Sequence, residues 1–259
     1  MSLGFLETTP IAIVCLGVTA LMLVFGEVGY RLGVHARNRH DWQAPASLGP
    51  MVGALLGMLA FVLAFTFSMA SSQHDLRKRN VLQEVNAIGT AYLRADLAEA
   101  PQRDEMKQLL REYVEVRLRG TSPLELEAAI ARSVAIHRLL WAEATAAARA
   151  APSPNTALVV ESVNTLIDMH EQRVTGALRN RVPGSVWIAL VAIITLTMVT
   201  LGTQVGLTGN RRLGAVIPLI LAFAVLVVLV VDLDRPQTGL ITVGQQAMVG
   251  LQRSLAEGR

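Results

Sequence analysis

The chain has 259 residues, of which 52% are hydrophobic, 17% charged and 5% aromatic, and its formal net charge is +3. A soluble domain usually carries about 25% charged residues. The deficit is local, because charged residues crowd between about residues 74 and 181 and are nearly absent from both ends. This segregation indicates lipid around the ends and water around the middle, and it excludes nucleic acid as an expected partner, since the arginines cluster beside apolar stretches.

Four apolar stretches are each long enough to cross a bilayer core of about 30 Å as a helix. They comprise residues 11–30, 48–70, 186–207 and 213–231, and only the first contains a charged residue, Glu27. The leader before the first stretch contains Glu7 and no Lys or Arg, so we expect an uncleaved span rather than a signal peptide. The pattern predicts two transmembrane hairpins, from residues 1–73 and 183–232, with a tight turn at residues 210–212 in the second.

The second span carries a narrow face of small residues, Gly53, Gly57, Ala60 and Ala64, at helical spacing. Gly202 and Gly206 repeat this spacing in the third span. Small residues let two helix backbones approach closely in lipid. The partner of the second span is another helix of the same chain or a second subunit, unless the face lines a pore.

Polar side chains within the spans have two interpretations. Glu27 can pair with Arg31 one turn later or snorkel to the interface, or it can serve a function, because ionisable groups at membrane depth are costly. Thr66 and Ser68, with several threonines of the third span, can line a polar path. Hydroxyl groups can equally bond to a carbonyl of their own helix.

Residues 74–182 are predicted to form an extramembrane helical domain. Its first helix continues the second span to about residue 97, with an apolar stripe of Val81, Leu82, Val85, Ile88 and Tyr92. The second runs from Pro101 to Gly120 and buries Met106, Leu109, Leu110, Tyr113 and Val114. The third begins at the capping box of residues 122–125 and ends near residue 151, and the fourth covers residues 156–182. Glu84 with Lys78 and Arg111 with Glu115 are interpreted as pairs on solvated faces.

Residues 233–259 form a C-terminal tail. Asp232, Asp234 and Arg235 lie at the water boundary of the fourth span, where they can bind an ion or form an ion pair, or simply end the helix before Pro236. An amphipathic helix is predicted from Leu240 to Leu255, and we expect it to dock on the helical domain.

Sequence motifs for enzyme chemistry are missing. The sequence contains no Gly-rich phosphate loop, no G-x-S-x-G elbow and no paired-histidine helix motif. The single cysteine, Cys15, lies in an apolar run, and the five histidines include no close pair on one helix face. We therefore expect neither catalysis nor a metal site nor a cofactor.

Two segments together with the C-terminal motif point to a family. Residues 61–68 read F-V-L-A-F-T-F-S, and residues 84–96 read E-V-N-A-I-G-T-A-Y-L-R-A-D. With the D-L-D-R-P run at residues 232–236, Gly239 and the glutamine pair at 245–246, the chain resembles a bestrophin-like family of bacterial membrane proteins over nearly its whole length. The resemblance implies an all-α membrane protein with four transmembrane helices as two hairpins and an inserted helical domain.

A more distant resemblance is to the bestrophins, which are pentameric anion channels. Their second span carries an F-V-L-G-F-Y-V run whose aromatic residues ring the pore neck, and this implies neck positions for Phe61 and Phe65. Gly57 stands where channels have a further apolar neck residue. The acidic calcium clasp of the channels is replaced here by residues 234–239, so calcium gating is not expected.

The channel interpretation also assigns roles to the residues around the neck. Gly57, Thr66 and Ser68 are the candidates for the pore lining, and Arg77, Lys78 and Arg79 are the candidates for an inner mouth that attracts anions. Aromatic side chains from several subunits that surround a symmetry axis can gate a pore by dewetting. The alternative is that Phe61 and Phe65 face lipid or neighbouring helices.

An even number of spans puts both termini and the helical domain on one side of the membrane. That side carries slightly more Arg and Lys, which predicts a multi-pass protein of the cell inner membrane with a cytoplasmic helical domain. The expected partners are the lipid bilayer, further copies of the chain in a homo-oligomer such as a pentamer, and an anion. The competing hypothesis is a non-conducting scaffold or signalling protein that binds its partner through the helical domain.

Overall fold

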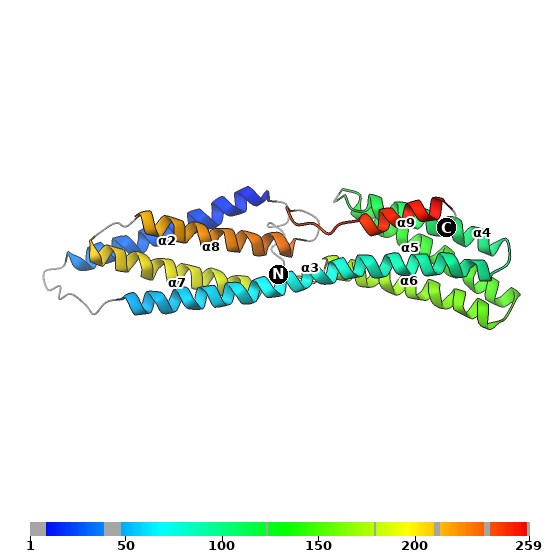
Figure 1. The fold of residues 1–259 in the computed structure, drawn as a ribbon. Coiled ribbons are helices and arrows are strands. Elements are labelled where there is room, and N and C mark those ends of the chain that lie inside the picture. Colours follow the sequence, from blue (N-terminus) through cyan, green and yellow to red (C-terminus); the bar gives the residue numbers. More distant parts are fainter. Residues whose placement is uncertain are drawn as a thin grey trace. The chain divides into compact units, whose positions relative to one another are not determined.

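The computed structural model describes residues 9–38, 48–122, 124–178, 180–209, 213–235 and 239–257. Within these ranges the chain is almost entirely helical and contains no strand, which confirms the all-α fold (Figure 1). The elements are α2 (Ile11–Arg37), α3 (Gly49–Arg94), the 3-10 turn η1 (Ala95–Leu97), α4 (Gln102–Arg119), α5 (Leu126–Ala150), α6 (Pro154–Leu178), α7 (Gly184–Thr208), α8 (Leu213–Asp234) and α9 (Gln246–Ala256). The predicted turn at residues 210–212 lies outside the described residues, as do Pro123 and Pro236.

Four helices are long and apolar enough to cross a membrane, which confirms the predicted spans. They are α2, the first part of α3, α7 and α8. Helix α2 continues to Arg37, beyond the predicted end of the apolar stretch, because a helix need not stop where the lipid stops. Pro218 lies inside α8 near its start, where a missing N–H is tolerated without ending the helix.

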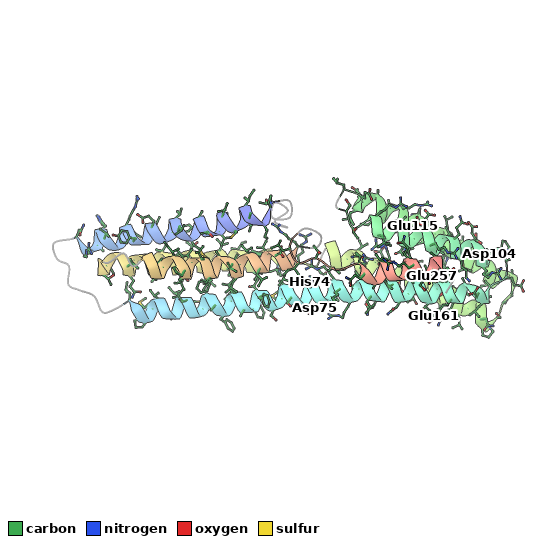
Figure 2. All side chains as sticks on the ribbon, turned by 45° about the horizontal axis from the view of Figure 1, so that its top comes forward. His74, Asp75, Asp104, Glu115, Glu161 and Glu257 are labelled. Atoms are coloured by element: carbon green, nitrogen blue, oxygen red, sulfur yellow. The ribbon has the colours of Figure 1, made fainter. Side chains whose placement is uncertain are left out.

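The chain packs as two compact units, each with its own core. The first unit comprises Met1–Gln73 and Arg181–Ile241, and the second comprises His74–Asn180 and Thr242–Arg259. Helix α3 supplies its first half to one unit and its second half to the other. Figure 2 labels Asp104, Glu115, Glu161 and Glu257, which all belong to the second unit and are exposed, as expected for a unit in water.

Helices α2 and α7 of the first unit pack backbone against backbone. A Cβ atom added at Gly29 or Gly33 would overlap a carbonyl of α7, and one added at Gly202 or Gly206 would overlap a carbonyl of α2. Only glycine permits so close an approach, and the approach supplies the dispersion contacts that hold helices together in lipid. Gly202 and Gly206 thus pack within the chain.

Unlike the glycines of α2 and α7, the small-residue face of the second span is not covered by another helix among the described residues. A Cβ atom added at Gly53 or Gly57 would meet nothing within 4 Å, and Ala60 and Ala64 are exposed. In the part of the chain that the structure describes, no helix covers this face, so the alternative of a partner helix from the same chain is wrong here.

The second unit is a helical bundle around a core that includes Ile88, Leu110, Tyr113, Ile136 and Leu166. The predicted buried face of residues 106–114 is confirmed. The predicted stripe on α3 is wrong at Leu82, which is 53% exposed, because the buried face is narrower than the apolar pattern.

Three predicted helix ends in this unit are corrected. Helix α5 starts at Leu126, and the Glu125 side chain at its N-cap makes no capping hydrogen bond, so the capping box lies in the turn before the helix. Helix α6 ends at Leu178 rather than residue 182. Helix α9 begins at Gln246 instead of Leu240, which is exposed, and its Met248 and Leu255 join the core of the second unit, as predicted for a docked tail.

Candidate functional site

The core of the second unit contains a fully buried carboxylate. Glu84 of α3 is 0% exposed. Its Oε1 lies 3.0 Å from Nε of Arg117 in α4, and its Oε2 pairs with Nη1 of Arg173 in α6. Tyr113 of α4 donates its hydroxyl hydrogen to the same Oε1 at 2.6 Å. Three groups on two other helices therefore converge on one side chain.

Two histidines complete this group, which we call the Glu84 cluster: Glu84, Tyr113, Arg117, His137, His170 and Arg173. Nδ1 of His170 lies 3.1 Å from the Tyr113 oxygen. Because the Tyr113 hydrogen already goes to Glu84, Nδ1 must be the donor in this contact and so carries a proton. His137 of α5 contacts the His170 ring edge to face, with ring centroids 4.7 Å apart.

The surroundings of Glu84 and His137 determine the charge states of these two side chains. Burial raises the pKa of Glu84, but hydrogen bonding to His170, the charges of Arg117 and Arg173 and the Tyr113 hydrogen bond outweigh burial and hold that pKa well below its usual range. Burial, with the neighbouring His170, lowers the pKa of His137 to about 4. At neutral pH Glu84 is ionised and His137 is neutral, so two guanidinium groups face one carboxylate.

The segment before α9 is tied to the same group. Nη2 of Arg173 donates to Oε1 of Gln245 at 3.0 Å. The cluster thus links α3, α4, α5, α6 and the start of the C-terminal helix. These contacts favour one arrangement of the bundle over others, because separating the charges would leave them buried without a counter-charge. Among the described residues no group of three or more His, Cys, Asp or Glu side chains is placed to hold a metal ion.

The sequence interpretation of Glu84 as half of an exposed pair with Lys78 is wrong. Glu84 follows Val81 by three residues and precedes Ile88 by four, so the helix carries it on the buried face while Lys78 is exposed. A carboxylate within an apolar stripe was the signal that could have identified it.

The pair of Arg111 with Glu115 is wrong as well. Arg111 donates to the Tyr92 hydroxyl at 2.6 Å and to the Leu255 carbonyl at 3.2 Å, while Glu115 faces Arg119. The Arg111 side chain therefore helps to hold α9 against α3 and α4. Tertiary contacts have replaced the local pair that helical spacing favoured.

The neck candidates lie on the uncovered face of α3. Phe61 is 72% exposed and Phe65 is 60% exposed, and Gly57 and Ser68 share their side of the helix. Thr66 lies on the opposite, buried side and donates its hydroxyl hydrogen to the Val62 carbonyl at 2.7 Å. The structure thus brings Gly57, Phe61, Phe65 and Ser68 together and separates Thr66 from them.

Other polar residues of the spans bond to groups within one turn of the same helix. Thr197 and Thr200 donate to the carbonyls of Ile193 and Leu196, each one turn earlier. Glu27 accepts from Nε of Arg31 at 3.0 Å, which confirms the local ion pair. Of the mouth candidates, Arg77 is buried and takes part in interactions, whereas Lys78 and Arg79 are exposed.

The acidic residues at the end of α8 hold a turn. The Asp232 carboxylate accepts hydrogen bonds from the backbone N–H groups of Leu240 and Ile241 at 2.8 to 3.1 Å, and Asp234 accepts one from Val182 at 2.9 Å. A Cβ atom at Gly239, whose φ is +150°, would overlap Asp232. Arg235 next to them is buried. Because backbone donors occupy Asp232, its visible role is to close the chain back after α8.

Comparison with known proteins gives a family match. A family model described as the Bestrophin-like domain matches residues 17–248. The matched range contains all four spans in whole or in part, the Glu84 cluster and the Asp232 turn. No curated protein and no solved structure matches the chain.

Proposed function

Since the chain belongs to the bestrophin-like family, we propose that it is an oligomeric anion channel of the cell inner membrane in which copies of α3 surround the pore. The observation that carries this proposal is the uncovered face of α3. It combines small residues with two exposed phenylalanines. Buried residues of the same helix, among them Leu59 and Leu63, belong to one apolar core with residues of α2, α7 and α8. A helix with one such free face is suited to a position beside a symmetry axis, with that face toward the axis.

The small residues favour a protein partner for this face over lipid alone. In the same unit Gly29, Gly33, Gly202 and Gly206 serve to bring two helices into backbone contact. Gly53, Gly57, Ala60 and Ala64 have the same spacing and meet no helix of their own chain among the described residues. Neighbouring copies of the chain supply the missing contacts in this proposal.

The phenylalanines then form the neck. Phe61 and Phe65 are one turn apart, so copies around an axis present two apolar rings that resist wetting when narrow. Gly57 and Ser68 extend the lining in the two directions along the helix. Lys78 and Arg79 follow on the exposed surface and raise the local anion concentration. In this proposal the assembly is a ring such as a pentamer, and the helical domain lies in the cytoplasm.

The proposal is tested by mass and by flux. The purified protein in detergent should have the mass of a ring, and in liposomes it should pass chloride. Phe61→Ala should change the flux, whereas Leu16→Ala, an equally exposed apolar residue on α2, should not. A monomer without flux would overturn the proposal, and an equal response to both substitutions would remove α3 from the pore.

The alternative of a non-conducting scaffold draws on the second unit. Leu93, Leu139 and Trp141 are large apolar side chains that remain exposed on helices of a unit in water. Such side chains favour a protein partner only if they gather into one patch. Crosslinking that joins a defined partner to residues 74–181, in a protein that does not conduct, would favour the scaffold.

A further inference from the structure

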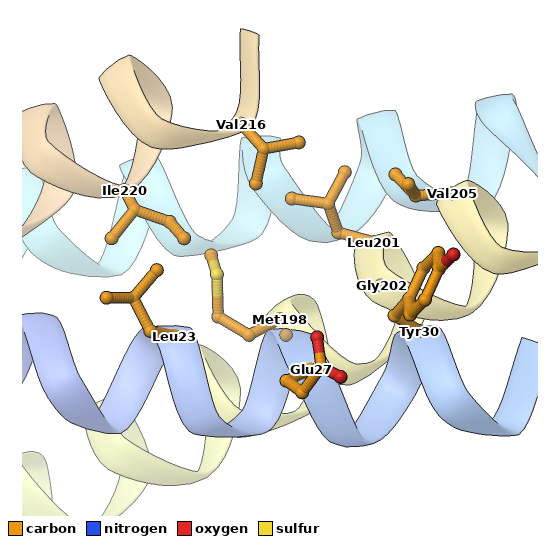
Figure 3. Close-up of a pocket in the computed structure, with 10 residues that line it drawn as sticks. Leu23, Glu27, Tyr30, Met198, Leu201, Gly202, Val205, Val216 and Ile220 are labelled. Carbon is orange, nitrogen blue, oxygen red and sulfur yellow. The ribbon is translucent and has the colours of Figure 1, made fainter. Parts of the chain in front are cut away.

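The first unit contains a cavity of about 100 Å³ between α2, α7 and α8 (Figure 3). Leu23, Met198 and Ile220 point toward one another at one end. Glu27 and Tyr30 of α2 also line it, so the cavity has an apolar floor and polar groups on one wall. Leu23 is 47% exposed, which means that the cavity borders the outer surface of the unit.

Gly26 leaves part of this space open. Gly26 and Gly202 both line the cavity, and neither projects a side chain into it. A Cβ atom added at Gly26 would meet nothing within 4 Å, although the Gly26 carbonyl is in close contact with Gly202. The backbone contact between α2 and α7 therefore leaves room beside it, on the side that α8 closes with Val216 and Ile220.

We propose that the cavity binds one phospholipid, with part of an acyl chain on the apolar floor and an amine-bearing zwitterionic headgroup at the Glu27–Arg31 pair. An apolar cavity of about 150 Å³ holds a benzene molecule. The cavity here, at about 100 Å³, is smaller and has room for a few methylene groups of one acyl chain. The occupant comes from the bilayer, because the cavity borders a surface of membrane-spanning helices.

The Glu27–Arg31 pair selects the headgroup by charge. Glu27 and Arg31 place a carboxylate beside a guanidinium, with 3.0 Å between Oε1 and Nε, and both side chains remain partly exposed. A primary ammonium donates to the carboxylate while the phosphate accepts from the guanidinium. A choline headgroup has no N–H to donate, and a glycerol headgroup brings a negative charge without a cation. Tyr30 beside them is a side chain that favours the headgroup level.

The test uses the delipidated full-length protein and native mass spectrometry. Phosphatidylethanolamine, phosphatidylcholine and phosphatidylglycerol with identical acyl chains are titrated separately. We expect one ethanolamine lipid per chain to bind about tenfold more tightly than either of the others, the scale of one charge-assisted hydrogen bond. Glu27→Gln should abolish this preference without emptying the cavity.

A matched pair of glycine substitutions tests the location. Gly26→Leu fills the cavity and should abolish the bound lipid, whereas Gly17→Leu, on the same helix and equally open, should not. Equal affinity for the three lipids overturns the headgroup assignment, and retention by Gly26→Leu overturns the site. Because lipid binding is read without any flux, its outcome is independent of the channel proposal.

Discussion

The helices inside the two units of this protein pack by different means. In the second unit the helices surround apolar side chains and a buried ion cluster at Glu84. In the first unit α2 and α7 meet through glycines at backbone distance. The hydrophobic effect brings helices together in water but not in lipid, so close packing is the main interaction left to membrane helices.

Polar side chains follow this division only in part. In the first unit Thr66, Thr197 and Thr203 donate to carbonyls of their own helices. In the second unit Tyr113 and Arg173 donate to a carboxylate on another helix. Ser133 and Thr165 of the second unit also donate to carbonyls of their own helices. What sets the second unit apart is therefore the Glu84 cluster, whose side chains come from four helices.

The largest expected effect is that of Glu84→Gln. The change leaves Arg117 and Arg173 buried without their counter-charge, which costs about 3–5 kcal/mol of unfolding free energy. Hydrogen exchange read by mass spectrometry should rise across residues 74–180 and stay unchanged across residues 181–235. Glu161→Gln, on the exposed side of α6, is the control. Equal loosening of both units would mean that they do not differ as described.

Gly202→Val should produce the converse pattern. Its side chain would overlap the Gly26 carbonyl and force α2 away from α7, at a cost of about 3 kcal/mol. Exchange should rise in α2 and α7 while the second unit keeps its protection. Gly17→Val, where nothing lies within 4 Å, should leave both units as they are. Tolerance of Gly202→Val would contradict the backbone contact.

Acidification should weaken the second unit. The pKa of His137 is about 4 when folded and 6.5 when free, so the unfolded chain binds more protons between these values. Stability therefore falls as the pH drops through this window, by about 2 kcal/mol between about pH 7 and pH 5. The stabilisation by ionised Glu84 is fully present above its ordinary pKa of 4.5 and is lost only as the pH falls below that value. Thermal unfolding at a series of pH values should show a flatter profile for His137→Gln.

The smallest expected effect is that of Asp232→Asn. One carboxylate oxygen is replaced by an amide that cannot accept the N–H of Leu240 or Ile241, at a cost of about 1 kcal/mol. Exchange should rise locally at residues 239–241. Asp104→Asn, on the exposed surface of α4, serves as the control. No local change would mean that the Asp232 turn is held by other contacts.

The sequence predicted the positions of the helices better than it predicted the contacts between them. The spans and the second helix of the helical domain are confirmed, because apolar length and periodicity are local properties. The start of α5 was misplaced because the capping box lies in the turn before Leu126. Glu84 was misassigned because charge alone favours the surface, and its partners lie 29 to 89 residues away in the chain.

The sequence by itself determined that four segments are long and apolar enough to span a bilayer and that the residues between the second and the third form helices. The free energy of transferring a helix from water to lipid depends mainly on its own side chains, so its neighbours in the fold need not be known. Only the tertiary structure decided which faces those helices use. It buried Glu84, closed Gly202 on Gly26 and left Phe61 and Phe65 uncovered, because each outcome depends on residues distant in sequence that folding brings together.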